Sequence, residues 1–309
     1  MPDHDHDHHG HHHGSAPAPR GFGAAFALGT ALNAGFVAAE VGFGLAAHAT
    51  ALLADAVHNA GDVLGLLLAW GAAVLARRLP SRRRTYGWGR GSILAALVNA
   101  VVLLMGVGAI TLAALQRLLA PAPVAAGMVV WVALAGVAVN GITAWMFSRG
   151  HADLNIRATF LHMAGDAAVS LGVVLAAVLI GVTGAMWIDP AASLLIAAVV
   201  VVGTWGVLRE AITLAMDFVP AGIAPADVDR FLRTLPGVVE VHDLHIWGLS
   251  TTETALTAHL VHVGAPPGEA VILEATRELG ARFAIGHATL QLETEALARA
   301  CRLRPAEVV

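Results

Sequence analysis

Two pentapeptides, His58-Asn-Ala-Gly-Asp62 and His162-Met-Ala-Gly-Asp166, place a histidine and an aspartate at the same spacing in two distant parts of the chain. Each lies inside a long apolar stretch, where an ionisable side chain is costly and needs an explanation. Residues four apart lie on one face of a helix, one turn from each other. Two such helices packed together therefore offer two imidazole nitrogens and two carboxylates to one ion.

This set of ligands suits a tetrahedral zinc ion, and the two aspartates neutralise its charge in low-dielectric surroundings. We predict an intramembrane metal site with four members, His58, Asp62, His162 and Asp166. Asp55 lies three residues before His58 and is expected to guide ions or to hydrogen-bond a ligand histidine. In the alternative interpretation, each pair hydrogen-bonds within its own helix and holds the bundle together. Two pairs with matched spacing and depth favour the metal site.

The composition indicates a membrane protein. The 309 residues are 57% hydrophobic and 13% charged, whereas a soluble domain carries about 25% charged residues. Six apolar stretches each approach the roughly 20 residues that a membrane-spanning helix needs. They lie at 21–46, 51–76, 91–118, 124–148, 156–182 and 187–212. We expect a six-helix transmembrane bundle over residues 21–214, with the two motif helices in the matching halves of an inverted repeat.

All 18 basic residues are arginines, and their placement orients the bundle. If the spans alternate, Arg20, the cluster from Arg77 to Arg90, the linker with Arg149 and Arg157, and Arg209 near the end of the sixth span fall on one side. Arg117 is the exception. By the positive-inside rule, both termini are cytoplasmic. The absence of lysine excludes a Walker A phosphate loop and a pyridoxal phosphate Schiff base.

The N-terminal end of the chain differs from the apolar middle. Residues 1–20 contain HDHDHHGHHH at positions 4–13, which we interpret as a native, disordered tail that collects metal. The other interpretation is a purification tag.

The last part of the chain, residues 215–309, is richer in charged residues and shows shorter apolar runs. Helical patterns at 225–235 and 268–283 and alternating patterns at 238–247, 254–263 and 287–293 follow one another there. That order predicts a small α+β domain with helices on one face of a short sheet. Cys301 is the single cysteine, so an intrachain disulfide is excluded.

Several stretches resemble the signatures of the cation diffusion facilitator family. They are Leu53 to Asp62, Tyr86-Gly-Trp-Gly-Arg90 leading to Asn99, Asp153-Leu-Asn155 leading to the second pentapeptide, and Asp243-Leu-His-Ile-Trp247. The resemblance covers nearly everything after the histidine-rich tail. It implies a six-helix transporter with a cytoplasmic, ferredoxin-like and metallochaperone-like C-terminal domain, working as a homodimer by metal–proton antiport.

The pattern His-x-x-x-Asp in both helices is similar to the zinc-exporting bacterial branch of the family. The chain departs from it at Gly91-Ser92, where many members carry an acidic residue, and at His48-Ala-Thr50, where a serine is frequent. Both departures leave the four ligands untouched, but they bear on metal selectivity.

The resemblance also implies a regulatory metal site in the C-terminal domain, at the positions matching His242, His259 and His287. The same domain holds further ionisable residues, including His262 and Glu293. The alternative, that several of these histidines are ordinary members of a strand face, remains open.

The sequence thus predicts secondary active efflux of divalent metals, chiefly zinc, from the cytoplasm in exchange for protons. Cadmium, cobalt and nickel also accept nitrogen and oxygen ligands and are further candidate substrates. One alternative is an intramembrane zinc enzyme, but such a zinc keeps an open position for water, and the His-Glu-x-x-His signature is absent from the sequence. The other is a membrane-tethered metal sensor, for which six spans exceed what an anchor needs. We expect a multi-pass protein of the cell inner membrane whose partners are metal ions, protons, lipid and a second copy of the chain, with no nucleic acid.

Overall fold

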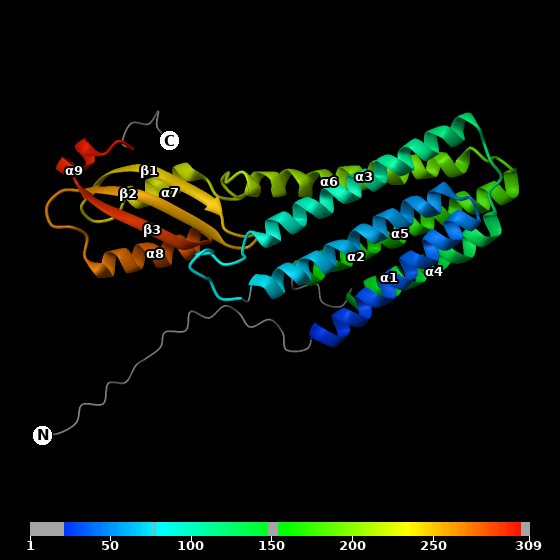
Figure 1. The fold of residues 1–309 in the computed structure, drawn as a ribbon, viewed down its shortest axis with the longest axis horizontal. Helices are drawn as coiled ribbons and strands as arrows, with labels where there is room; N and C mark the ends of the chain where they lie inside the picture. The colour runs from blue at the N-terminus through cyan, green and yellow to red at the C-terminus, as the bar shows by residue number, and fades with distance from the viewer. Residues whose placement is uncertain (1–21, 77, 148–153, 304–309) are drawn as a thin grey trace, which may run out of the picture.

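The computed structural model describes residues 22–76, 78–147 and 154–303. Six long helices lie side by side and form one elongated bundle, and a smaller unit that contains a sheet follows at one end (Figure 1). The helices are α1 (Phe22–Ala46), α2 (Thr50–Ala76), α3 (Gly91–Leu119), α4 (Ala126–Phe147), α5 (Leu154–Thr183) and α6 (Ile188–Ala215). Their bounds differ by only a few residues from those that the apolar stretches predict.

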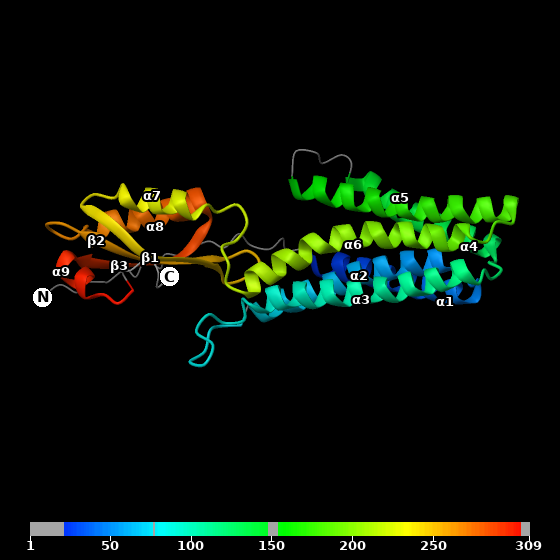
Figure 2. The same ribbon diagram turned by 90° about the horizontal axis from the view of Figure 1, so that it is seen from above.

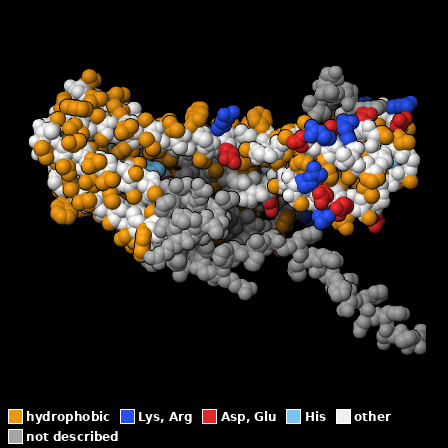
Figure 3. Space-filling model, turned by 180° about the vertical axis from the view of Figure 1, so that it is seen from behind, with side chains coloured by type: hydrophobic (Ala, Val, Ile, Leu, Met, Phe, Trp, Pro, Cys, Tyr) orange, Lys and Arg blue, Asp and Glu red, His pale blue; other side chains and the backbone are white. Residues whose placement is uncertain are grey.

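The surface of the bundle is apolar. Four of its helices are long and apolar enough to cross a membrane, and the described apolar parts of the other two are shorter, Thr30–Ala46 and Ala126–Ile142. Seen from behind, hydrophobic side chains cover the bundle, whereas most charged side chains in view gather over the other end of the molecule (Figure 3). The predicted six-helix membrane bundle is confirmed.

Small residues line the interior of the bundle where α1 turns into α2. Ala47, Ala49 and Ala51 are each at most 2% exposed, and they pack with Leu52 and Val173 in one cluster. Without a hydrophobic drive between helices in lipid, small side chains stabilise a bundle by letting backbones approach closely. This packing brings α2 and α5 together, the two helices that carry the pentapeptides.

The smaller unit is an α+β domain with a three-stranded sheet. Its strands are β1 (Val238–Gly248), β2 (Thr254–His262) and β3 (Ile285–Thr294), in that spatial order. β1 and β2 are antiparallel, and β2 and β3 are parallel. A parallel pair needs a crossover connection, which α8 (Glu269–Phe283) provides.

Two helices, α7 (Pro225–Arg233) and α8, cover one face of the sheet (Figure 2). Leu232 of α7 and Leu279 of α8 are fully buried against Leu256 and Leu260 of β2. The α+β domain with helices on one face is confirmed. A short helix, α9 (Glu295–Ala300), follows β3 directly and was not expected from the sequence.

Polar contacts at the N-terminal end of α3 join that helix to the α+β domain and to the segment that leads into it. Arg90 Nη2 lies 2.5 Å from Asp217 Oδ1, just after α6. The backbone N–H of Thr251, in the β1–β2 turn, donates to Ser92 Oγ at 3.1 Å. These contacts connect the domain to α3 in addition to its covalent link through α6.

Candidate metal centres

The first centre, which we name the helix cluster, consists of His58, Asp62 and Asp166. His58 and Asp62 come from α2 and Asp166 from α5, and one ligand atom of each lies within 4.8 Å of the others. His58 Nε2 is 3.0 Å from Asp166 Oδ1. The structure therefore brings together, across two helices, three of the four residues that the sequence analysis expected to meet.

Burial gives the helix cluster the properties of a site for a cation. The side chains of His58 and Asp166 are 18% and 6% exposed, and His58 Nδ1 is buried without a hydrogen-bond partner. A carboxylate inside an apolar bundle is stable when it is paired or binds a metal ion. Nitrogen and carboxylate oxygen are ligands that Zn²⁺ accepts in tetrahedral sites.

The fourth expected ligand, His162, belongs to α5, but its side chain lies outside the described part of the chain. Its backbone position is one helical turn before Asp166, so the two residues share a face of α5. That placement is compatible with the expected four-ligand site.

Asp55, which was expected to guide ions or to hydrogen-bond a ligand histidine, accepts a hydrogen bond from a serine of α5. It is 0% exposed and accepts from Ser170 Oγ of α5 at 2.9 Å. Glu40 of α1 is buried beside it and accepts from Asn59 Nδ2 at 2.9 Å. A second polar group, distinct from the helix cluster, is thus present in the bundle.

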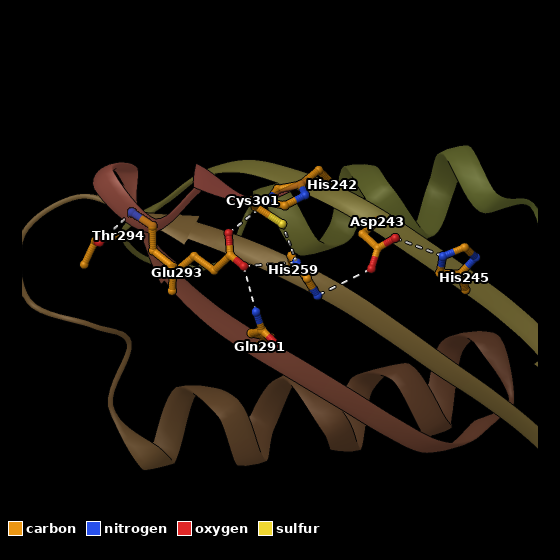
Figure 4. A network of polar contacts seen from close by, with 9 residues as sticks. His242, Asp243, His245, His259, Gln291, Glu293, Thr294 and Cys301 are labelled. Atoms are coloured by element: carbon orange, nitrogen blue, oxygen red, sulfur yellow. Dashed lines mark hydrogen bonds and ion pairs between the residues drawn. The ribbon is translucent and has the colours of Figure 1, made fainter. Parts of the chain in front are cut away.

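The second centre, which we name the sheet cluster, consists of His242, His259, Glu293 and Cys301 (Figure 4). One ligand atom of each lies within 4.8 Å of the others. Glu293 joins the two histidines, because its Oε2 lies 3.1 Å from His242 Nε2 and its Oε1 lies 3.0 Å from His259 Nδ1. Cys301 Sγ, just after α9, is 3.9 Å from His259 Nδ1.

The register of the sheet explains this meeting. His242 of β1 is the direct cross-strand partner of His259 of β2, which pairs in turn with Gln291 of β3. Glu293 follows Gln291 by two residues and therefore points to the same face. Gln291 Nε2 donates to Glu293 Oε1 at 2.7 Å and helps to orient that carboxylate.

Asp243 extends the sheet cluster toward the surface. It adopts a left-handed conformation, with φ of 52°, within the irregularity between His242 and His245. Its two carboxylate oxygens lie 3.4 Å from His259 Nε2 and 3.0 Å from His245 Nε2. Both ring nitrogens of His259 therefore face carboxylates, and Figure 4 shows the chain of contacts.

His287 lies apart from the sheet cluster, although the sequence analysis grouped it with His242 and His259. It pairs with Ala255, four residues before His259 on β2, so it is about 13 Å away along the strand. Its ring instead meets the ring of Tyr86 edge-on, with centroids 5.6 Å apart. In the structure, Glu293 and Cys301 lie beside His242 and His259, in the place expected for His287.

Two family models match the chain. The model described as the cation efflux transmembrane domain matches residues 27–214, and the model described as the cation efflux protein cytoplasmic domain matches residues 220–295. The helix cluster falls within the first match, and three members of the sheet cluster fall within the second.

Curated proteins of similar length resemble the chain over most of its residues. The cation efflux system protein CzcD of an Alcaligenes species is 35% identical over 266 residues, which cover 85% of this chain and 84% of that protein. The zinc transporter ZitB of Escherichia coli is 34% identical, with coverage of 85% and 84%. The cadmium, cobalt and zinc/H⁺–K⁺ antiporter of Bacillus velezensis is 34% identical, with coverage of 85% and 85%.

One solved structure similar to the chain is the metal-bound C-terminal domain of the CzcD transporter from Cupriavidus metallidurans. It is 36% identical and covers 23% of this chain and 99% of that domain, with a TM-score of 0.22. The transmembrane family model matches most of the chain, and CzcD of the Alcaligenes species is similar to it over most of both proteins. The chain therefore belongs to the cation efflux family.

Proposed function

We propose that this protein exports divalent metal, chiefly zinc, from the cytoplasm in exchange for protons. The helix cluster is the observation that supports this proposal most directly. One ligand atom each of His58, Asp62 and Asp166 lies within 4.8 Å of the others, between two helices of the membrane bundle. We propose His162 as the fourth ligand, from the turn that precedes Asp166. One relative is named as a zinc transporter and another as an antiporter of cadmium, cobalt and zinc, and both names support this choice of substrates. Nickel binds to the same types of ligand.

Proton exchange follows from the chemistry of the ligands. Metal binds to deprotonated imidazole and carboxylate, so protons and metal compete for the same atoms. Histidine ordinarily titrates near pH 6.5, so a modest pH difference shifts this competition. In the proposed cycle, metal loads from the cytoplasm, the bundle rocks to open outward, and protonation of the ligands releases the ion there.

Two other function classes are less well supported. A catalytic zinc keeps an open coordination position and a nearby general base, whereas four protein ligands fill a tetrahedron. A pure sensor needs only the α+β domain and an anchor. We therefore propose that the protein is a transporter without a catalytic reaction, and that the sheet cluster binds metal to regulate it.

The arginines support an orientation for the chain. Arg78, Arg82, Arg83 and Arg84 follow α2 at the end of the bundle nearest the α+β domain. By the positive-inside rule, we propose that this end faces the cytoplasm in the inner membrane, with both termini on that side. We also propose a tail at residues 1–20, a membrane domain at 21–214 and a cytoplasmic domain at 215–309.

The resemblance to the family supports a homodimer in the lipid bilayer, and nothing in the charge pattern calls for a nucleic acid. Multi-angle light scattering of the detergent-solubilised protein tests the dimer directly. A mass equal to that of one chain would contradict it.

Zinc uptake into proteoliposomes with an imposed pH gradient tests the proposed function. We expect gradient-dependent uptake by the wild-type protein and none by D166A, with M163A, a neighbouring substitution on α5, as the control. Uptake that ignores the gradient would indicate a channel or uniporter. Uptake by D166A at the wild-type rate would refute the assigned site.

A further inference from the structure

Two carboxyl groups are buried together beside the helix cluster. Glu40 of α1 and Asp55 of α2 are each 0% exposed, and their carboxyl groups are within hydrogen-bonding reach of each other. Asn59 donates to Glu40, and Ser170 donates to Asp55, each at 2.9 Å. Three helices therefore meet at this carboxyl pair.

Each carboxyl group keeps one oxygen that no donor reaches. Glu40 Oε1 and Asp55 Oδ1 are both buried without a hydrogen-bond partner. Two adjacent carboxylates without a compensating cation are costly to bury, and a hydrogen bond between them requires a proton on one of them. A single shared proton supplies the missing donor and removes one of the two negative charges.

No basic residue fills that role in the part of the chain that the structure describes. Arg117, on the bundle, pairs with Asp189 at 3.4 Å and with a backbone carbonyl. The ionisable groups that act on Asp55 from α2 and α5 are His58 and Asp166, both members of the helix cluster. A change in the charge of the helix cluster therefore changes how strongly the carboxyl pair holds a proton.

The carboxyl pair is displaced from the helix cluster toward the end of the bundle far from the sheet. Asp55 precedes His58 by three residues, and Ser170 follows Asp166 by four, which amounts to about 4.5 Å along α2 and about 6 Å along α5. Because α2 and α5 run in opposite directions, both displacements point the same way (Figure 1). At this distance a change in charge at one site acts on the other in low-dielectric surroundings.

We propose that Glu40 and Asp55 share one exchangeable proton in the metal-free protein and lose it to water when metal binds at the helix cluster. Incoming metal cancels the charges of the ligand aspartates, which lowers the cost of a second negative charge on the pair. An O–H bond of the pair breaks, the proton passes to water, and the pair changes from one negative charge to two. This inference rests on the proposed metal–proton exchange and gives it a proton site separate from the ligands.

Isothermal titration with zinc, in buffers of different ionisation enthalpy, counts the protons released per zinc bound. We compare the full-length wild-type protein with E40Q, which keeps the size and polarity of the side chain but removes its titration. E210Q, at an exposed glutamate near the end of α6, is the matched control. The tail and the sheet cluster are the same in all three proteins, so differences in the proton count report on the pair.

The expected result is unchanged zinc stoichiometry in E40Q with about one proton fewer released per zinc, and a wild-type count in E210Q. An unchanged count in E40Q that still binds zinc would overturn the proposal. A wrong assignment of the metal ligands gives a different result, namely a number of zinc ions bound per chain that D166A leaves unchanged.

If E40Q fails to fold, infrared difference spectroscopy of the wild-type protein still decides the question. Zinc binding must then remove the C=O band of a protonated carboxylic acid and add a carboxylate band. A spectrum in which zinc removes no carboxylic acid band would overturn the proposal.

Discussion

His58 Nε2 of α2 lies 3.0 Å from Asp166 Oδ1 of α5, so the two repeated pentapeptides touch each other inside the bundle. Both residues belong to the set that the spacing of the pentapeptides predicted. This contact gives the buried carboxylate of Asp166 a hydrogen-bonding partner. In the proposed metal-bound site, each of the two side chains is instead a ligand.

The proposed fourth ligand leads to the first prediction. H162A should weaken zinc binding at the helix cluster by at least about 10- to 100-fold. That is the loss of affinity seen when a residue that hydrogen-bonds to a metal ligand is removed, and the loss of a ligand itself should cost no less. Zinc affinity measured by competition with a chromogenic chelator checks this. M163A should bind zinc as the wild-type protein does, and equal affinity in H162A would remove His162 from the site.

The sheet cluster leads to a second prediction. Because Glu293 contacts both His242 and His259, E293Q should bind one zinc fewer per chain than the wild-type protein. H287A should bind the full amount, since His287 lies apart from the sheet cluster. Equilibrium dialysis measures both, and a loss of zinc in H287A but not in E293Q would reverse this assignment.

Zinc bound at the sheet cluster should also stabilise the α+β domain. A ligand at about 100 times its dissociation constant adds about 2.7 kcal/mol to the free energy of unfolding. We expect chelation to lower the melting temperature of the wild-type protein, and to lower that of E293Q less. Equal shifts in the two proteins would indicate that zinc stabilises the protein elsewhere.

Asp189 at the start of α6 holds the opposite end of the bundle together. It is 2% exposed and accepts from the Thr50 N–H, the Thr50 hydroxyl and the Ala51 N–H at 2.6 to 3.0 Å, which caps α2. D189N should cost about 1 to 3 kcal/mol of stability, because a buried group loses charge-assisted hydrogen bonds. Thermal unfolding in detergent measures this, and E210Q, at an exposed site, should leave the melting temperature unchanged.

Gly89 lies at the junction between the bundle and the α+β domain. A Cβ atom there would lie 2.9 Å from the backbone oxygen of Leu249, whereas one at Gly91 would meet nothing within 4 Å. We expect G89A to destabilise this junction by about 1 to 3 kcal/mol and G91A to be tolerated. Limited proteolysis between the two domains distinguishes them, and equal cleavage of G89A and the wild-type protein would contradict the close contact.

Much of the fold could be predicted because the bilayer fixes the length and composition of its helices. The six apolar stretches gave helix bounds within a few residues, and the repeated histidine–aspartate spacing identified the members of the helix cluster whose side chains the structure describes. Both signals are local, because each depends only on residues within one helix.

The sheet cluster could not be predicted fully, since its members meet through strand register. Glu293 reaches His259 because β3 pairs in parallel with β2 after the α8 crossover. Cys301 reaches the same place because α9 turns the chain back after β3. For Glu293, the sequence signal was a glutamate in an alternating apolar strand. The role of Asp189 could not be predicted, since its partners lie on the distant helices α2 and α3.

The most direct test of the central claim, that metal binds at the helix cluster, is zinc stoichiometry in a protein whose sheet cluster is disabled. We predict that E293Q/D166A binds one zinc fewer per chain than E293Q, with both proteins folded by thermal unfolding. Equal zinc binding by the two proteins, at the same affinity, would contradict the assignment of the helix cluster as the transport site.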